Sequence, residues 1–256
     1  MDPRLAIIGE RFKDVKRLIA VAGGKGGIGK SMIASTLALI LSDLGYRVGL
    51  LDLDFCGPST HVILGIDGVY PEEDKGIIPP QVHGIKFLSI VYYAGDNPSP
   101  LRGIDVSNAV IELLAITRWG PLDFLIIDMP PGIGDTALET VRLLKGVEFL
   151  VITTPSKVAL ETVGKTLRIL KEMSVPIIAV IENMKMAESS YVREQIRKID
   201  VPFGGEIAFD RGLEDSVGDA GRLLETDFAQ NLRQIVLSRP EFKLHPTGYL
   251  RSRGRP

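Results

Sequence analysis

The amino-acid sequence predicts a doubly wound α/β fold, in which helices cover both faces of a mostly parallel sheet. Short apolar runs rich in β-branched residues alternate with longer helical patterns, as in proteins built from βαβ units. Several of these runs, such as Phe-Leu-Ile-Ile at 124–127 and Ile-Ile-Ala-Val at 177–180, contain no polar residue. Strands that are buried on both faces have this composition.

The first half of the predicted fold starts with a short apolar strand at 17–22. A helix is expected at 30–44, where apolar residues recur at helical spacing, and a second apolar strand at 47–52. Residues 65–81 carry Gly, Pro and acidic residues without periodicity, so we expect an excursion there. It leads into a third strand at 86–90.

The second half continues the alternation between apolar runs and helical patterns. The expected strands are residues 123–128, 148–153 and 176–181. The expected helices are residues 107–119, 136–145, 159–173, 190–199 and 226–237. Residues 1–240 are predicted to form a single domain, and the basic segment 241–256 is predicted to be a solvated tail.

Composition narrows the class of protein. The 256 residues are 45% hydrophobic and 24% charged, which suffices for one large domain with a buried core. A net charge of -2 gives no overall attraction to nucleic acid or anionic lipid, and no apolar run is long enough for a membrane helix. The start of the chain has no signal-peptide pattern, and the single cysteine, Cys56, fits a reducing compartment. These features predict a cytoplasmic protein and argue against membrane or nucleic-acid partners.

A phosphate-binding loop is predicted between the first strand and the first helix. Residues 24–31 read Gly-Lys-Gly-Gly-Ile-Gly-Lys-Ser and match the pattern G-x-x-x-x-G-K-[ST]. Glycines there let backbone N–H groups meet phosphate oxygens at the positive end of the following helix. Lys30 is expected to contact the terminal phosphates and the Ser31 hydroxyl to bind Mg²⁺, the alternative being a glycine-rich turn without ligand. The residues assigned to the nucleotide are Gly24, Lys25, Gly26, Gly27, Ile28, Gly29, Lys30 and Ser31.

Carboxylates follow two of the predicted strands. Asp128 comes after four apolar residues, a Walker B pattern, and is expected to bind Mg²⁺ through a water. Asp52 and Asp54 end the second strand and lie on the same side of an extended segment. Because open α/β sheets bind ligands at the carboxyl ends of their strands, one of this pair is the best candidate to orient the attacking water. Ordinary strand-end turn residues are the alternative for these acids.

A possible contact to the base follows the last predicted strand. Asn183 can offer a donor and an acceptor to the adenine edge, although asparagine after a strand is also an ordinary turn residue.

The phosphate loop resembles the deviant Walker A motif, K-G-G-x-G-K-[ST], of the ATPase group that includes MinD, ParA and the nitrogenase iron protein. The resemblance implies a homodimer with two ATP molecules between facing loops, in which Lys25 reaches the nucleotide of the other subunit. Without this resemblance Lys25 would be interpreted as a solvated loop cation. The resemblance also assigns the attacking water and a place at the Mg²⁺ to Asp54. It favours adenine recognition by Asn183, with the backbone of 208–210 on the other side.

Further strings narrow the resemblance to the Mrp family, also called the ApbC type. They are Asp-Phe-Cys-Gly-Pro-Ser at 54–59, Arg-Gly at 102–103, Trp-Gly at 119–120, Leu-Asp at 122–123, Asp-Met-Pro-Pro-Gly-Ile-Gly-Asp at 128–135, Thr-Thr-Pro at 153–155, Glu-Asn-Met at 182–184 and Gly-Glu-Ile at 205–207. The family is thought to bind an iron–sulfur cluster at the dimer interface and to pass it to apoproteins, coupled to ATP.

The sequence departs from this family in its cysteines. Typical members carry a C-x-x-C pair soon after the Glu-Asn-Met string, whereas residues 184–191 read Met-Lys-Met-Ala-Glu-Ser-Ser-Tyr. Thiolates are the ordinary cluster ligands, and thioethers are poor substitutes. Two copies of Cys56 would supply only two thiolates, so we expect Cys56 to be structural and the usual cluster site to be absent.

The sequence therefore predicts a Mg²⁺- and ATP-dependent homodimeric switch of the Mrp type with slow hydrolysis. It would take part in iron–sulfur assembly in one of two ways. It would either hold a cluster with unconventional ligands or act on a partner, which would be an iron–sulfur client or a cysteine-bearing paralogous scaffold protein. The alternative is a MinD- or ParA-like positioning ATPase acting on membrane, DNA or a partner protein. The sequence shows no strong amphipathic membrane anchor and no basic stripe other than the arginines near the C-terminus, which argues against this alternative. A small-molecule kinase is disfavoured because no arginine cluster suggests a lid.

Overall fold

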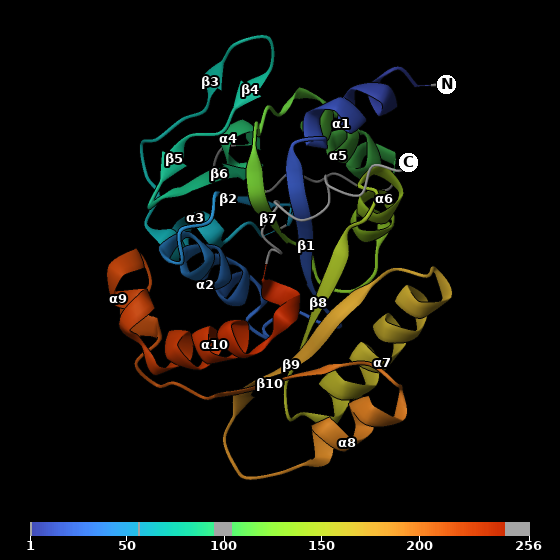
Figure 1. The fold of residues 1–256 in the computed structure, drawn as a ribbon, viewed down its shortest axis with the longest axis vertical. Helices are drawn as coiled ribbons and strands as arrows, with labels where there is room; N and C mark the ends of the chain where they lie inside the picture. Colours follow the sequence, from blue (N-terminus) through green and yellow to red (C-terminus); the bar gives the residue numbers. More distant parts are fainter. Residues whose placement is uncertain (1, 56, 95–103, 244–256) are drawn as a thin grey trace, which may run out of the picture.

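The computed structural model describes residues 2–55, 57–94 and 104–243, and one eight-stranded sheet lies at its centre (Figure 1). The strand order is β10-β9-β8-β1-β7-β2-β6-β5, and all neighbours are parallel except β5 and β6. These strands are β1 (Val15–Gly23), β2 (Val48–Asp52), β5 (Gln81–Val82), β6 (Ile85–Ser89), β7 (Leu122–Asp128), β8 (Glu148–Thr153), β9 (Ile177–Lys185) and β10 (Phe203–Ala208). Cys56, the string at 102–103 and the tail from 244 lie outside the described residues.

Helices cover both faces of the sheet, which confirms the predicted doubly wound α/β fold (Figure 1). One layer contains α1 (Arg4–Phe12), α5 (Ile104–Ile116), α6 (Asp135–Leu143), α7 (Lys157–Glu172) and α8 (Tyr191–Lys198). The opposite layer contains α2 (Lys30–Asp43), α3 (Thr60–Leu64), α9 (Ala220–Glu225) and α10 (Asp227–Ser238). A short helix, α4 (Val91–Ala94), follows β6. Among the described residues, no helix combines the length and apolarity needed to cross a membrane.

The central strands are buried on both faces, as their continuous apolar runs predicted. In β1, Leu18 and Ala20 face the core under α1 and α5, whereas Ile19 and Val21 face the core under α2. Both faces are therefore buried, and no polar alternation is possible.

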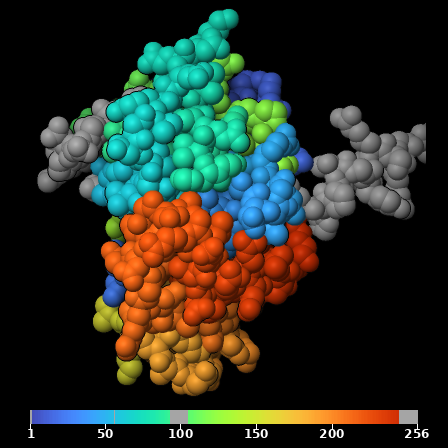
Figure 2. Space-filling view, turned by 90° about the vertical axis from the view of Figure 1, so that its left-hand side faces the viewer, coloured from blue at the N-terminus to red at the C-terminus, as the bar shows by residue number. Residues whose placement is uncertain are grey.

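Several elements of the fold were not predicted, among them α4, β5 and α9, and three further parts show why. The excursion at 65–81 contains a small hairpin of β3 (Glu72–Glu73) and β4 (Ile77–Ile78), which lies at the end of the molecule away from α9 and α10 (Figures 1 and 2). Helix α1 was not predicted either; its Ile8 and Phe12 are buried and pack into the core, whereas the apolar Ile7 is exposed. Strand β10 contains two glycines, so its extended form depends on pairing with β9 rather than on local propensity.

Side chains from the C-terminal part of the described chain cover the outer edge of β10. Arg239 donates hydrogen bonds to the carbonyls of Gly204 and Phe203, and the Asn231 side chain accepts one from the Ala208 N–H. These bonds satisfy groups that an edge strand would otherwise expose. A short 3-10 turn, η2 (Pro240–Phe242), then buries Phe242 in the α2 layer. The boundary at 240 between domain and tail stays a prediction.

Asp123, near the start of β7, ties three segments together. Its carboxylate lies 2.9 Å from Lys16 Nζ and 3.1 Å from Arg47 Nη2, and it accepts a hydrogen bond from the Arg47 N–H. The bonds from Arg47, helped by Lys16, hold the pKa of Asp123 well below its ordinary value. Asp123→Asn is therefore expected to lower the free energy of unfolding at pH 7 by about 1–3 kcal/mol.

The pH dependence of this loss has a definite sign. Because the pKa of Asp123 is lowered in the folded state, its carboxylate stabilises the fold above the unfolded-state pKa of about 4, and this contribution disappears as the pH falls below that value. Calorimetry between pH 7 and pH 3 should show the wild type and variant converging. Asp74→Asn is the control, since its ion pair with Arg118 is solvent-exposed and worth under about 1 kcal/mol. Equal losses in the two variants would refute the role of Asp123.

Candidate nucleotide-binding site

The carboxyl ends of β1, β2 and β7 bring the predicted site residues to one edge of the sheet. In the strand register Asp128 pairs with Val21 of β1 on one side and with Asp52 of β2 on the other. The loop 24–29 follows β1 directly and ends where α2 begins at Lys30. The predicted phosphate loop, Walker B aspartate and paired acids therefore share one location.

Steric limits explain the glycines of the loop. Gly29 has a φ of +82°, and a Cβ there would lie 2.4 Å from the Asn183 Nδ2 atom. A Cβ on Gly24 would lie 2.7 Å from the Val163 backbone N in α7. Gly27 also has a positive φ, of +72°, but it and Gly26 are exposed, and a Cβ on either would meet no atom of the described residues within 4 Å. The two ends of the loop therefore pack closely against α7 and β9, whereas its middle residues are exposed to solvent.

Substitution of Gly29 tests this explanation. Gly29→Ala is expected to lower the free energy of unfolding by about 1–3 kcal/mol, because it combines a left-handed backbone with a clash against Asn183. Gly26→Ala is the matched control and should change the free energy of unfolding by less than about 0.5 kcal/mol, since the φ of Gly26 lies outside the left-handed region and a Cβ there would meet none of the described atoms within 4 Å. Thermal denaturation of the nucleotide-free protein measures both. Equal stability of the two variants would contradict this account.

Asp128 lies fully buried beside the start of α2, and neither of its carboxylate oxygens has a hydrogen-bond partner among the described residues. Burial, and next the neighbouring Asp52, raise the pKa of Asp128 to about 8, while Ser31 and Lys30 oppose the rise. A buried carboxylate without a partner is costly unless a cation compensates it. Carboxylate and hydroxyl oxygens are also the ligands that Mg²⁺ prefers, so this arrangement fits a magnesium ion.

The structure separates the two acids that follow β2. Asp52 is fully buried, and its carboxylate accepts hydrogen bonds from the Asp54 N–H at 3.0 Å and from the Thr60 hydroxyl at 2.6 Å. Asp52 therefore fixes the backbone between β2 and α3. Asp54 is only half-buried and accepts a bond from the Gly57 N–H at 3.2 Å. Of the two, Asp54 is the more exposed.

Asn183 fastens the phosphate loop to β9. Its Nδ2 atom donates a 2.9 Å hydrogen bond to the carbonyl of Ile28, and the side chain is buried. Asn183 also lines a cavity of about 280 Å³ next to the loop. The other residues around this cavity include Gly29, Met32, Met184, Ala208, Phe209, Asp210 and Phe228. The segment 208–210 thus lies across from Asn183, and adenine binding there stays a prediction.

The remaining sequence assignments concern Lys25 and the stretch that follows Asn183. Lys25 is half-buried, and its side chain makes no hydrogen bond or ion pair with any described residue. Met184 has a φ of +58°, and Met186, just after β9, is 80% exposed. The role of Lys25 in a second subunit stays a prediction.

Comparison with known proteins identifies the family. A family model described as NUBPL iron-transfer P-loop NTPase matches residues 14–223. The chain belongs to this family. Among curated relatives, the iron-sulfur cluster carrier protein of Aquifex aeolicus is 43% identical over 68% of this chain and 49% of its own length. That of Pyrococcus horikoshii is 43% identical over 83% of this chain and 77% of its own length. The resemblance to the iron–sulfur cluster carrier family is thereby confirmed.

Solved structures agree with this membership in fold. The nucleotide-binding protein of Archaeoglobus fulgidus in complex with ADP has a TM-score of 0.71 and 29% identity, and the match covers 86% of this chain and 93% of that one. The septum site-determining protein MinD of Pyrococcus horikoshii with Mg-ADP has a TM-score of 0.65 at 21% identity over 86% of this chain and 93% of its own. The chain does not match the whole length of its curated relatives: it spans 49% of the length of the iron-sulfur cluster carrier protein of Aquifex aeolicus and 61% of that of Pseudomonas fragi.

Proposed function

We propose that this chain is a cytoplasmic, homodimeric ATPase switch of the Mrp type that hydrolyses Mg-ATP slowly and serves iron–sulfur cluster assembly or transfer. The observation that carries the ATPase is the fully buried Asp128 carboxylate, which lies beside Lys30 and Ser31 at the start of α2 and meets the geometric criteria of a hydrogen bond with none of the described residues. The names of the relatives, iron-sulfur cluster carrier proteins, support the second half of the proposal.

In this proposal the phosphates lie along the loop 24–29, where backbone N–H groups and the Lys30 ammonium bind them. Ser31, Asp54 and Asp128 hold the Mg²⁺ ion, which would neutralise charge on the phosphate oxygens when bound. Asp54 orients the attacking water, and Asp52 keeps the backbone of Asp54 in place through its 3.0 Å hydrogen bond.

Two further contributions complete the proposed site, one from the facing subunit and one from the cavity beside the loop. Lys25 adds a cation to the nucleotide of the facing subunit, which is consistent with its lack of partners within the described residues. Asn183 and the segment 208–210 hold the adenine in the neighbouring cavity of about 280 Å³.

The cluster itself is cargo rather than a resident group. The chain has one cysteine, and residues 184–191 contain none, so a cluster would need other ligands or a cysteine-bearing partner. Anaerobic reconstitution, with iron and sulfide counted per dimer, tests the carrier role, and Cys56→Ala is the control. A stable cluster that is lost in Cys56→Ala supports direct carriage. If no cluster forms under conditions that load a cysteine-bearing relative, direct carriage is excluded.

A further inference from the structure

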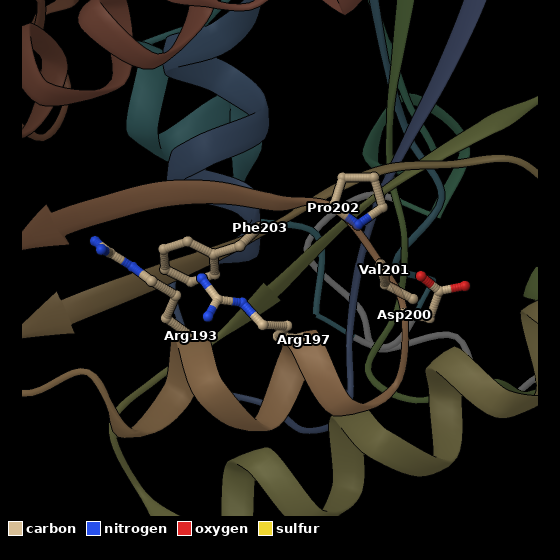
Figure 3. Close-up of a pocket in the computed structure, with 6 residues that line it drawn as sticks. All are labelled: Arg193, Arg197, Asp200, Val201, Pro202 and Phe203. Atoms are coloured by element: carbon tan, nitrogen blue, oxygen red, sulfur yellow. The ribbon is translucent and has the colours of Figure 1, made fainter.

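A groove lies at the outer end of the sheet, between α8 and the beginning of β10 (Figure 3). Its volume is about 510 Å³, and its lining residues are Arg193, Arg197, Asp200, Val201, Pro202 and Phe203. None of these residues belongs to the phosphate loop, to the acids beside it or to the cavity next to Asn183. The groove therefore needs an explanation separate from nucleotide binding.

The groove carries more positive than negative charge. Arg193 donates one 2.9 Å bond to Glu206 and lies 5.3 Å from the centre of the Phe203 ring, which leaves most of its five N–H donors available. Arg197 is exposed, and its side chain has no hydrogen bond or ion pair within the described part of the chain. The Asp200 carboxylate points away from the groove in Figure 3 and is 3.9 Å from Lys171.

The spacing of the two arginines indicates the shape of the ligand. Arg193 and Arg197 are four residues apart on one face of α8, which is about 6 Å along a helix axis. Alternate residues of an extended peptide are about 6.6 Å apart, so two acidic side chains at alternate positions match this spacing. In Figure 3 the guanidinium groups lie apart on different sides of the Phe203 ring. Two separate carboxylates suit this arrangement better than one phosphate group, which would require the guanidinium groups to converge.

The floor of the groove suits a peptide backbone. Phe203 and Pro202 give it an apolar surface, and the outer edge of β10 is already occupied by side chains of Arg239 and Asn231. A bound segment would therefore lie across α8 and Phe203 instead of adding a strand to the sheet.

We propose that this groove binds an extended acidic segment of a partner protein, in which two carboxylates at alternate positions pair with Arg193 and Arg197. Charge-assisted, bidentate pairs of this kind specify position as well as affinity. The proposal does not depend on ATP or on an iron–sulfur cluster.

The test uses the full chain and a fluorescein-labelled peptide that carries glutamate at alternate positions. The control peptide has glutamine in place of each of these glutamates. Fluorescence anisotropy at low salt should show at least about tenfold weaker binding for the glutamine peptide and for the Arg193→Gln/Arg197→Gln variant. Lys157→Gln/Lys165→Gln is the matched control: it removes the same charge from exposed positions on α7 and should bind as the wild type does.

Three results would overturn the proposal. They are equal binding of the glutamate peptide to the wild type and the arginine variant, an equal loss in the α7 control, and full displacement of the peptide by millimolar inorganic phosphate. The last would identify a site for small anions. Because Arg193 also pairs with Glu206, Arg197→Gln alone serves as a second variant. It should weaken binding at least about threefold without a change in melting temperature, and unchanged affinity in this variant would also overturn the proposal.

Discussion

Replacing Asp128 by asparagine is expected to reduce Mg-dependent ATP hydrolysis about a hundredfold or more, and at the same time to stabilise the nucleotide-free protein. The first effect follows if Asp128 holds the metal that neutralises the phosphates, since removal of one such electrostatic contribution costs about 10²–10³ in rate. The second follows because the carboxylate is fully buried, has no hydrogen-bond partner among the described residues and lies beside Asp52. A neutral amide of the same shape removes this cost.

The stability gain carries a pH signature. Burial and Asp52 raise the pKa of Asp128 to about 8, so between about pH 4 and pH 8 the folded state holds a proton that the unfolded state has released. The wild type is therefore expected to gain stability as the pH falls through this window. The Asp128→Asn variant lacks that part of the gain, and its advantage should be largest at pH 8, at least about 1 kcal/mol.

Calorimetry without nucleotide at pH 8 and pH 6, together with a phosphate-release assay, measures both effects. Asp54→Asn is the matched control: it makes the same chemical change in the same site, but Asp54 is half-buried and accepts a bond from Gly57. It should lose hydrolysis without gaining stability. An Asp128→Asn protein that is no more stable than the wild type would mean that the carboxylate is already compensated. Retained hydrolysis would remove Asp128 from the metal site.

The central strands were predictable because their composition records their environment. β7 and β9 lie inside a parallel sheet, and the runs at 124–127 and 177–180 are apolar because helices cover both faces of the sheet. The strand β10 has no continuous apolar run that would indicate its place in the sheet. It contains Gly204 and Gly205, and it is held by β9 on one side and by Arg239 and Asn231 on the other. Those contacts involve residues far along the chain, which no local pattern reveals.

The site was predictable to the extent that a motif determines it. The loop pattern and the apolar strand before Asp128 are local, and the fold brings them together because their strands are neighbours in the sheet. The strand pattern alone could not distinguish the roles of Asp52 and Asp54, since it places both carboxylates on the same side of an extended segment; only the family resemblance favoured Asp54. Burial and the 2.6 Å bond from Thr60 make Asp52 the residue that fixes the backbone. The bond from Asn183 to Ile28 joins residues 155 apart in sequence, so only the fold could reveal it.

Mixing Lys25→Ala protein with Asp54→Asn protein is expected to restore ATP hydrolysis that neither variant has alone. In the proposed homodimer Asp54 serves the nucleotide of its own subunit, whereas Lys25 serves the nucleotide of the other. In a mixed dimer the Lys25→Ala subunit keeps its own Asp54 and receives Lys25 from its partner, so one site is complete. The other site lacks both groups.

The expected recovery follows from random assortment. An equal mixture contains about half mixed dimers, each with one of two sites active, so about a quarter of the wild-type rate should return. Lys30→Ala mixed with Asp54→Asn is the control, because Lys30 begins α2 and, in the proposed site, binds the nucleotide of its own subunit. Neither site is complete in that mixed dimer, and no rate should return. If Lys25 acted within its own subunit, its mixture would be as inactive as the control. Recovery in the Lys25 mixture alone therefore separates the two geometries, because both mixtures contain the same Asp54 defect.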